Sequence, residues 1–444
     1  MKILPFRGFR YNPAKISKLD DVISPPYDQF REGLDDLLYE RHPYNIARII
    51  MNKEMPQDSA TDNRYTRSKA FLDQWVQEKV FLQDLQPGIY PYFQDFQVRG
   101  QSLKTRKGFV ALGEITEYSQ RIVLPHERTL AKPKQDRLNL LRATLADTGL
   151  VFMLYSDPQG KIEAMLGPLT SHQPDMVALD LNQERNRLWK VDNSAAIEEL
   201  QQAMRDKTVI IADGHHRYEV ALAFRRETAL RITKAKEWEL YGYKLMSFVR
   251  LESEGITILP IHRLIHSVIH FNPSEFLRRL PEFFAIQELP IVENRKLSVL
   301  EILMDALNKQ QLAGNNAFGL YLPALHKFAL LKFNRDTAHR ISWPADKTQT
   351  WRKLDVSVLQ VVILGHLLGI GERQLSEQTN LEYVSHHTDA IQMTDEKSFQ
   401  CAFLLNPTPI EHVKEVVEAG DILPQKSTHF HPKLMEGLVF AKHV

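Results

Sequence analysis

Short apolar runs and amphipathic stretches follow one another along the whole chain. Residues 109–115 and 150–155 are short apolar runs flanked by turn or charged residues, which predicts two strands. Residues 68–82 place Leu72, Trp75 and Val76 at helical spacing between polar residues, which predicts an amphipathic helix. Strands and helices mixed in this way predict an α/β fold of the mixed α+β type.

Two hairpins are predicted as well. One joins residues 248–251 to 256–261 through a Glu-Ser-Glu-Gly turn, and the other joins 318–322 to 328–333 around Pro323. The region around the second hairpin contains few catalytic residue types. We therefore predict a catalytic core at 1–271, an accessory α+β domain at 272–385, and a C-terminal segment at 386–444 that packs back on the core.

The last predicted helix has signals at both ends. Thr408 and Glu411 are spaced as in a capping box with Pro409 at the first helical position, and Gly420 is placed to end the helix. The loop that follows could be a solvated tail, but a helix capped at both ends favours a loop aimed at the protein. Its candidate substrate ligands are Lys426, Ser427 and Thr428.

The strongest chemical signal lies at residues 208–224. A β-branched run at 209–211 ends at Asp213 and Gly214, and a helical pattern begins at once. The first amides of a helix lack intrahelical partners and lie at the positive end of its dipole, so this turn is a candidate phosphate site. An ordinary strand-to-helix turn is the alternative. The candidate phosphate ligands are Gly214, His215, His216 and Arg217, and Asp213 is the candidate ligand for a cation.

Two further groups offer reactive side chains. The charged stretch at 125–142 includes Glu127 as a candidate base, although such a stretch is often a solvated face. It lacks the second histidine of an H-E-x-x-H zinc helix. The other group is a proline-stiffened turn at 24–28 that carries Asp28. The remaining candidates in the first group are His126 and Thr129 for substrate, and Lys134 and Arg137 for phosphate.

The composition of the chain limits the class of protein and the partners that it can have. A chain of 444 residues predicts two or three domains. The 56 Lys plus Arg balance 55 Asp plus Glu, which argues against a partner that is duplex DNA or an anionic membrane. The single cysteine, Cys401, excludes an intramolecular disulfide framework. The N-terminus lacks a signal-peptide pattern, and residues 356–370 are short for a membrane span, so we expect a cytoplasmic protein.

Several motifs together resemble a known family. They are PPYD at 25–28, PHERT at 125–129, ADGHHRYE at 212–219, ILPIHRL at 258–264 and LPQKST at 423–428. In this order they resemble the domain-of-unknown-function family 1015, over residues 5–438. Some members are described as L-serine kinases that use inorganic pyrophosphate, and the family is distantly similar to ParB-like and sulfiredoxin-like phosphate-binding folds. His429 and His431 stand where the family pattern would have aromatic residues, which puts substrate contacts at that point in doubt.

The resemblance implies transfer of a phosphoryl group from pyrophosphate, ADP or ATP to free L-serine. The residues could support this, with Gly214–Arg217 on the donor phosphate, Asp213 on Mg²⁺ or the acceptor, and Glu127 or Asp28 as the base. Two alternatives stay open: a metal-dependent phosphohydrolase or nucleotidase, and a non-enzymatic nucleotide-binding protein of the ParB-like kind. Small molecules are the expected partners, without nucleic acid or membrane, and a homodimer is left open.

Overall fold

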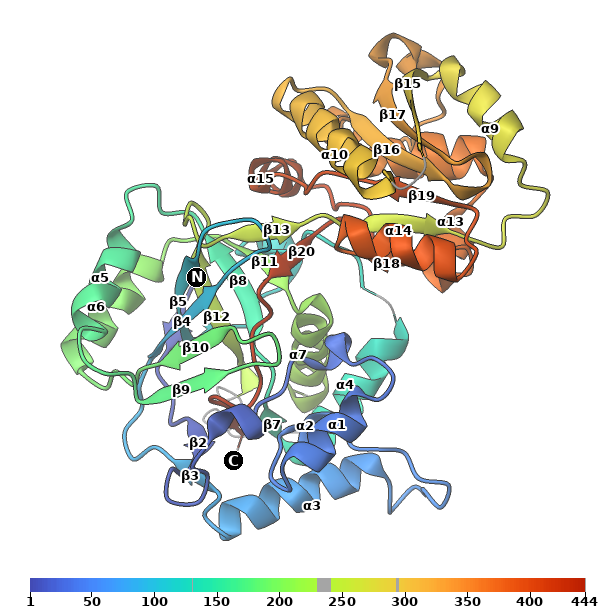
Figure 1. Cartoon of the computed structure of the whole chain (residues 1–444). Helices are drawn as coiled ribbons and strands as arrows, with labels where there is room; N and C mark the ends of the chain where they lie inside the picture. Colours follow the sequence, from blue (N-terminus) through green and yellow to red (C-terminus); the bar gives the residue numbers. More distant parts are fainter. Residues whose placement is uncertain (130, 230–240, 293–294, 444) are drawn as a thin grey trace. The chain divides into compact units, whose positions relative to one another are not determined.

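The computed structural model describes residues 1–129, 131–229, 241–292 and 295–443, and all side chains among them except those of 131–133. The chain forms two compact units. Unit 1 contains Met1–Pro125, Thr129–Thr257 and Pro432–Val444, and unit 2 contains His126–Arg128 and Ile258–His431. Helices and sheets occur in both units, and the large sheet of unit 1 combines parallel and antiparallel pairs, which confirms the mixed α/β class (Figure 1). The end of the chain thus returns to the unit in which the chain begins.

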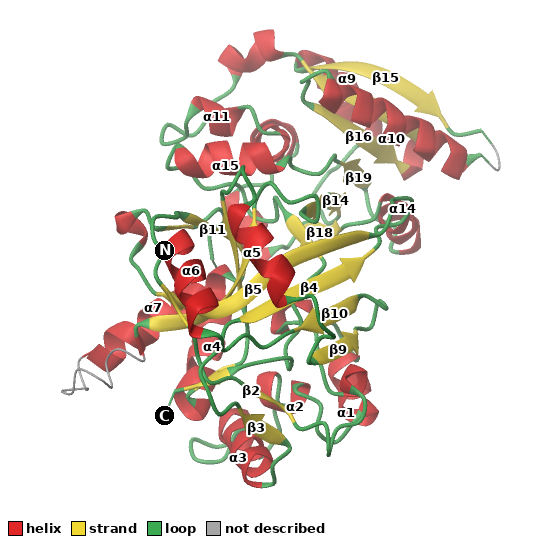
Figure 2. Cartoon of the chain, turned by 90° about the vertical axis from the view of Figure 1, so that its left-hand side faces the viewer, coloured by secondary structure: helices red, strands yellow, loops and turns green. Residues whose placement is uncertain are grey.

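Unit 1 is built on a nine-stranded sheet in the order β6-β11-β8-β12-β5-β4-β10-β9, with β1 also paired to β5. Its pairs are antiparallel except β11 with β6 and β12 with β8. Figure 2 shows β5, β4, β10 and β9 side by side. The strands are β1 (Ile3–Leu4), β4 (Tyr90–Phe96), β5 (Lys104–Glu114), β6 (Val123–Leu124), β8 (Val151–Tyr155), β9 (Met176–Leu179), β10 (Arg185–Leu188), β11 (Val209–Asp213) and β12 (Tyr243–Arg250).

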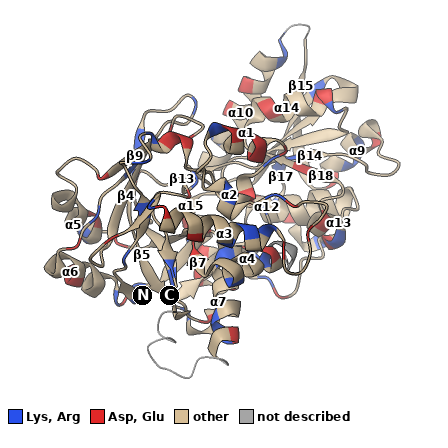
Figure 3. Cartoon of the chain, turned by 90° about the horizontal axis from the view of Figure 1, so that it is seen from below, with Lys and Arg blue, Asp and Glu red and all other residues tan. Residues whose placement is uncertain are grey.

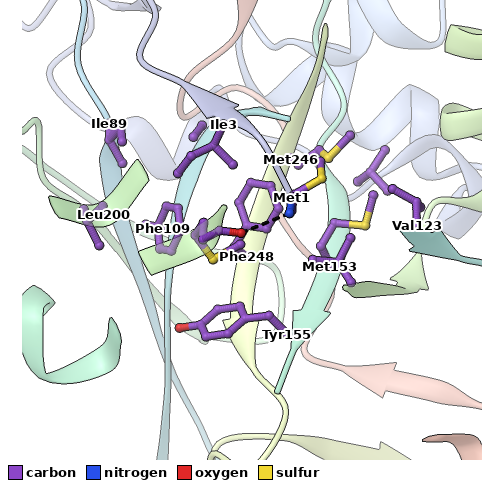
Figure 4. Close-up of a cluster of buried hydrophobic side chains, with 14 of the residues drawn as sticks. Met1, Ile3, Ile89, Phe109, Val123, Met153, Tyr155, Leu200, Met246 and Phe248 are labelled. Atoms are coloured by element: carbon purple, nitrogen blue, oxygen red, sulfur yellow. Dashed lines mark hydrogen bonds between the residues drawn. The ribbon is translucent and has the colours of Figure 1, made fainter. Parts of the chain in front are cut away.

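Apolar side chains from this sheet and its helices form one buried cluster. Met153, Tyr155 and Phe248 come from the central strands and Leu200 from α6, and all four are at most 1% exposed (Figure 4). Figure 1 shows α5 and α6 on one side of the sheet and α7 on the other. The helices of unit 1 are α1 (Leu34–Arg41), α2 (Ala47–Ile50), α3 (Arg64–Gln77), α4 (Ala131–Thr144), α5 (Lys161–Leu169), α6 (Ser194–Met204) and α7 (His215–Ala229).

A second cluster in unit 1 joins the two ends of the chain. Phe440, which is fully buried, stacks on Phe9 with ring centroids 5.3 Å apart and meets Phe81 edge-on at 4.8 Å. Helix α2 contributes Ile49 and Ile50 to this cluster, and α3 contributes Leu72 and Trp75. Two short sheets accompany it, β2 (Phe9–Tyr11) with β3 (Phe81–Gln83), and β7 (Ala146–Asp147) with β21 (Ala441–Lys442). The C-terminal residues are therefore part of the core of unit 1.

Opposite charges pair across the helices of unit 1. Arg64 of α3 contacts Asp136 of α4, and Arg142 of α4 lies 2.6 Å from Glu227 of α7. Figure 3 shows Lys and Arg in blue and Asp and Glu in red, interspersed along the ribbon. This mixing agrees with the near-zero net charge of the sequence.

Unit 2 has an antiparallel sheet in the order β15-β17-β16-β19-β14-β18. Residues of α10 and α14 pack on it around the buried Leu303, Phe328 and Leu404. The strands are β13 (Thr257–Leu259), β14 (His262–Ile265), β15 (Phe284–Pro290), β16 (Ala317–Leu322), β17 (Lys327–Phe333), β18 (Leu381–Val384), β19 (Cys401–Leu404) and β20 (His429–His431), of which β13 pairs with β20. The helices are α9 (Pro273–Arg279), α10 (Lys296–Leu312), α11 (Gln349–Arg352), α12 (Asp355–Val358), the π-helix Leu359–Leu367, α13 (Glu372–Glu377), α14 (His387–Glu396) and α15 (Ile410–Glu418).

Most of the predicted elements are confirmed. The strands at 109–115 and 150–155 are β5 and β8, and the hairpin at 318–333 is β16 with β17. The hairpin at 248–261 is wrong, because β12 pairs on its two sides with β5 and β8 while β13 pairs with β20. The helix expected at 68–82 is α3, which ends at Gln77. The chain then turns through Lys79, whose φ is 58°, into β3.

The predicted capping box at Thr408 is wrong as well. The N-cap of α15 is Pro409, and no side chain caps the helix there. The Thr408 hydroxyl instead donates to the carbonyl of Ser427 at 2.9 Å, which ties the helix start to the following loop. Gly420, with φ 82°, follows the helix end as expected. Among the described residues, no helix has the length and apolar character needed to cross a membrane.

Candidate functional site

The glycine turn joins β11 to α7. The register of β11 against β8 shifts between Ile211 and Asp213, so a β-bulge precedes the turn and redirects the Asp213 side chain. Gly214 follows with φ 89°, a conformation that favours glycine. A Cβ at Gly214 would lie 3.1 Å from Nε of Arg217. The bulge and the glycine thus place a carboxylate, a helix N-terminus and a guanidinium together.

Arg217 lies beneath this turn and is 7% exposed. One Nη donates to the carbonyl of Leu150, the other lies 3.9 Å from Asp213 Oδ2, and the buried Nε has no hydrogen-bond partner among the described residues. Burial alone would lower its pKa, but the carboxylates of Asp213, Asp28 and Glu436 raise it. Arg217 is therefore a fixed positive charge with an unused donor at the start of α7.

Asp213 is ion-paired with a lysine from the end of the chain. Lys433 Nζ lies 3.0 Å from Asp213 Oδ2, although 220 residues separate the two in sequence. Burial would raise the pKa of Asp213, but Lys433, Arg217 and His215 lower it well below the usual range. The group therefore combines one ionised carboxylate with several cations. Lys433 was not among the candidates from the sequence, although it lies in the segment that follows α15.

The proline turn near the N-terminus belongs to the same unit and meets the same C-terminal segment. Ser24 and Glu436 form an antiparallel bridge, with N–O distances of 3.1 and 2.9 Å. Tyr27 and the exposed Asp28 follow in a 3-10 helix, Tyr27–Gln29. Burial and the neighbouring Asp28 raise the pKa of Tyr27 to about 12. No local pattern connects this turn with Asp213, since only the fold brings the two into one unit.

A cavity of about 60 Å³ adjoins Arg217 within unit 1. Glu436, 3% exposed, and Lys244, 7% exposed, line it together with Tyr27 and Arg137. Burial raises the pKa of Glu436 against the opposing effect of Arg217, Arg137 and Lys244. Lys244 contacts Asp147 and donates to the carbonyl of Gly149 at 3.0 Å. Several buried charged side chains thus lie around Arg217.

Three of the predicted residues in the 125–142 stretch lie in unit 1. Thr129 Oγ1 and Lys134 Nζ both donate to Glu219 Oε2 of α7, at 2.7 and 2.8 Å. Arg137 donates to Asp136 and to the carbonyl of Ile50, and its guanidinium lies 4.4 Å from the Tyr27 ring centroid. The structure therefore brings Thr129 and Lys134 to the helix that starts at the glycine turn. Glu219 is the last residue of the ADGHHRYE motif and was not singled out as their partner.

The other predicted residues form a separate group in unit 2. His126 Nε2 lies 2.7 Å from Thr428 Oγ1, and Glu127 Oε1 accepts the backbone N–H of Lys426 at 3.2 Å. Lys426 is exposed and has φ 56°. Ser427 is buried and its hydroxyl donates to the carbonyl of Pro424. The loop at 425–433 is thus ordered, and its backbone is tied to the PHERT motif.

Magnesium was expected at Asp213. In the described part of the chain, no three His, Cys, Asp or Glu side chains are placed so that they could hold a metal ion together. Mg²⁺ commonly binds one or two carboxylates and completes its octahedron with water and substrate phosphates. Asp213 fits that pattern only when a donor supplies the other oxygen ligands, because Lys433 lies against the carboxylate.

The sequence matches a family of proteins of unknown function, DUF1015, over residues 3–357. The chain therefore belongs to this family, which the motif resemblance predicted. A comparison with curated proteins found no match.

Several solved structures resemble the chain. A conserved hypothetical protein from Pyrococcus furiosus has 12% identity and a TM-score of 0.35, with 75% of this chain and 95% of that chain covered. A free serine kinase in complex with AMP has 13% identity and a TM-score of 0.36, with 72% and 86% covered. SbnI with a C-terminal truncation, from Staphylococcus aureus, has 9% identity and a TM-score of 0.33, with 74% and 85% covered. At these identities and TM-scores, no activity transfers from these proteins to this chain.

Proposed function

We propose that this DUF1015 member is a small-molecule kinase that phosphorylates free L-serine in the cytoplasm, giving O-phospho-L-serine. The donor is pyrophosphate, ADP or ATP. One observation supports the donor site above all: Arg217, whose buried Nε has no hydrogen-bond partner in the part of the chain that the structure describes, lies at the glycine turn that begins α7. This arrangement suits a phosphate, since backbone amides and a guanidinium are the donors that phosphate oxygens accept. The serine assignment rests on the motif resemblance.

In this proposal the serine hydroxyl oxygen attacks the terminal phosphorus of the donor. A new O–P bond forms, the bridging P–O bond breaks, and with pyrophosphate the leaving group is orthophosphate. Positioning and charge neutralisation account for most of the catalysis in such reactions. Gly214–Arg217 would hold the donor, and Mg²⁺, bound by Asp213 and the donor oxygens, would neutralise further charge.

A carboxylate must take the hydroxyl proton. Asp28 is the candidate in unit 1, because its charge is close enough to raise the pKa of Arg217. Glu127 is the candidate in unit 2. Lys134 and Arg137 as phosphate ligands stay predictions, as do His126, Thr129, Lys426, Ser427 and Thr428 as substrate ligands.

Phosphorus NMR of the whole protein tests this function. Pyrophosphate, ADP and ATP are each incubated with Mg²⁺, with and without L-serine, and with a panel of other amino acids. The expected result is an O-phosphoserine resonance that requires both L-serine and one donor. Release of orthophosphate at the same rate without any amino acid would establish a hydrolase instead.

Two substitutions on α7 test whether the activity depends on the glycine turn. Arg217→Ala should lower turnover by roughly two orders of magnitude or more, as cationic phosphoryl clamps do. Arg226→Ala is the matched control, because Arg226 lies on the same helix with its side chain 66% exposed and pairs with Glu117. Near-normal turnover in Arg217→Ala would exclude the glycine turn as the donor site.

A further inference from the structure

The backbone that carries Lys433 is held by buried side chains of the large sheet. Arg106 of β5 donates to the carbonyl of Pro432 at 2.6 Å, and Gln94 of β4 donates to the carbonyl of Lys433 at 2.9 Å. Tyr92, also on β4, accepts the N–H of Met435 at 3.3 Å. The backbone on both sides of Lys433 is therefore fixed.

These three side chains are held in turn by one another and by β10. Asn186 Oδ1 accepts from the Tyr92 hydroxyl at 2.6 Å and from Gln94 at 2.9 Å. Arg106 contacts Gln94 Oε1, and its guanidinium lies 4.6 Å from the Phe152 ring centroid. The side chains of this network are buried: Tyr92 is 3% exposed, and Gln94, Arg106 and Asn186 are at most 2% exposed. Buried polar groups that satisfy each other rigidify the element they contact.

This network directs the Lys433 side chain to the glycine turn. Its Nζ has three N–H donors, and within the described residues Asp213 is its only partner. The Lys433 side chain is 18% exposed, so it is not sealed from solvent. It joins Arg217 and the N-terminus of α7 around one carboxylate. A lysine close to Asp213 in sequence could neutralise its carboxylate equally well. Lys433 instead lies 220 residues further along the chain, on a backbone that buried side chains hold in place.

We propose that Lys433 is a ligand of the donor phosphate, and that residues 432–435 complete the donor site. Its two remaining N–H groups bind phosphate oxygens opposite Arg217, while Asp213 keeps the ammonium group in place. Arg106, Gln94 and Tyr92 act as positioning residues through the backbone. The identity of the anion as a phosphoryl donor rests on the proposed function, whereas binding of the anion does not.

Calorimetric titration of the whole protein with inorganic pyrophosphate, in the absence of serine, tests this. Lys433→Met should weaken the affinity about tenfold or more, because a charge-assisted contact is lost. Lys433→Arg should recover part of that loss. Lys442→Met is the matched control, since Lys442 lies in the same segment, is 22% exposed and pairs with Asp73 at 2.7 Å. It should bind pyrophosphate as the unsubstituted protein does.

Thermal unfolding of each variant separates binding from folding. If the Lys433→Met variant binds pyrophosphate as tightly as the Lys442→Met variant does, the inference is wrong. It is also wrong if the unsubstituted protein binds no pyrophosphate. A Lys433→Met that loses affinity only together with a large drop in unfolding temperature, without recovery in Lys433→Arg, would also count against it. A protein that binds pyrophosphate through Lys433 but never phosphorylates serine would refute the proposed function and leave this inference standing.

Discussion

Among single residues, Asp213 is expected to make the acid stability of the protein depend on its cation partners. Lys433, Arg217 and His215 lower its pKa in the fold despite burial. A carboxyl group whose pKa is lower in the fold stabilises the folded protein above its unfolded pKa, about 4, and loses that contribution as pH falls further. Asp213→Asn removes it. The free energy of unfolding should therefore differ between the two proteins at pH 6 and converge as the pH is lowered below about 4.

Urea denaturation at several pH values measures this difference. Asp192→Asn is a suitable control, because Asp192 has 53% of its side chain exposed and pairs with Lys190 at the surface. An exposed pair contributes little to stability. A constant difference between Asp213→Asn and the unsubstituted protein from pH 6 to pH 2 would contradict the prediction.

Asp180 is predicted to show the opposite pH dependence. Burial and the neighbouring Glu184 raise the pKa of Asp180 to about 7. An acid with a raised folded pKa stabilises the fold in its protonated form, and that contribution is lost as pH rises through about 7. Asp180→Asn keeps the Oδ1 that accepts the N–H groups of Asn182 and Glu184. The variant should therefore unfold at a higher temperature than the unsubstituted protein at pH 8, and the gain should be lost by about pH 3.5, below the unfolded pKa of about 4. A gain that is equal at both pH values would contradict this.

At the scale of an element, the strand–glycine–helix turn has two separable properties. Gly214→Ala should cost about 1 kcal/mol for the left-handed backbone, and its Cβ would also contact Arg217 at 3.1 Å. Gly33→Ala isolates the backbone cost, because Gly33 has φ 80° and no atom near its Cβ position. Gly214→Ala should lose at least as much stability as Gly33→Ala in urea denaturation, but only Gly214→Ala should lose pyrophosphate affinity. Equal affinity in the two variants would place the anion elsewhere.

Secondary-structure elements that are determined by residues close together in sequence were predictable from the sequence. The run at 209–211 followed by Gly214 predicts the strand, the turn and the helix that are found, because β-branching and the freedom of glycine act over a few residues. The hairpin at 248–261 was wrong for the converse reason. Strand β12 is buried between β5 and β8, and which strands pair depends on residues 95 or more positions away.

The candidate site shows the same division. The glycine turn and the 125–142 stretch were found as motifs, and Thr129 and Lys134 do meet α7 at Glu219. Lys433 and Glu436 were not found, since no local pattern indicates that Lys433 pairs with Asp213 or that Glu436 lies beside Arg217. One local signal does indicate a buried polar contact. Glu436 is a charged residue within the otherwise uncharged, mostly apolar run 434–438.

At the scale of the whole molecule, the end of the chain supports both the fold and the site of unit 1. Residues 432–435 are bound by the sheet network, Glu436 pairs with Ser24, and β21 pairs with β7. Phe440 lies further along the same segment, in the cluster with Phe9 and Phe81. Removal of Pro432–Val444 is therefore expected to destabilise unit 1 as well as the donor site, so a truncation cannot test the site alone.

A substitution at Phe440 separates these two contributions. Phe440 is fully buried and stacks on Phe9, so Phe440→Ala should lower the free energy of unfolding by about 3–5 kcal/mol. Leu85→Ala, at a side chain that is 83% exposed, should change it by less than about 0.5 kcal/mol. Urea denaturation supplies both values. Below the denaturation midpoint, Phe440→Ala should still bind pyrophosphate, because Lys433 is held separately by Arg106 and Gln94. A loss of pyrophosphate affinity in the folded variant would mean that Phe440 and Lys433 are positioned as one unit.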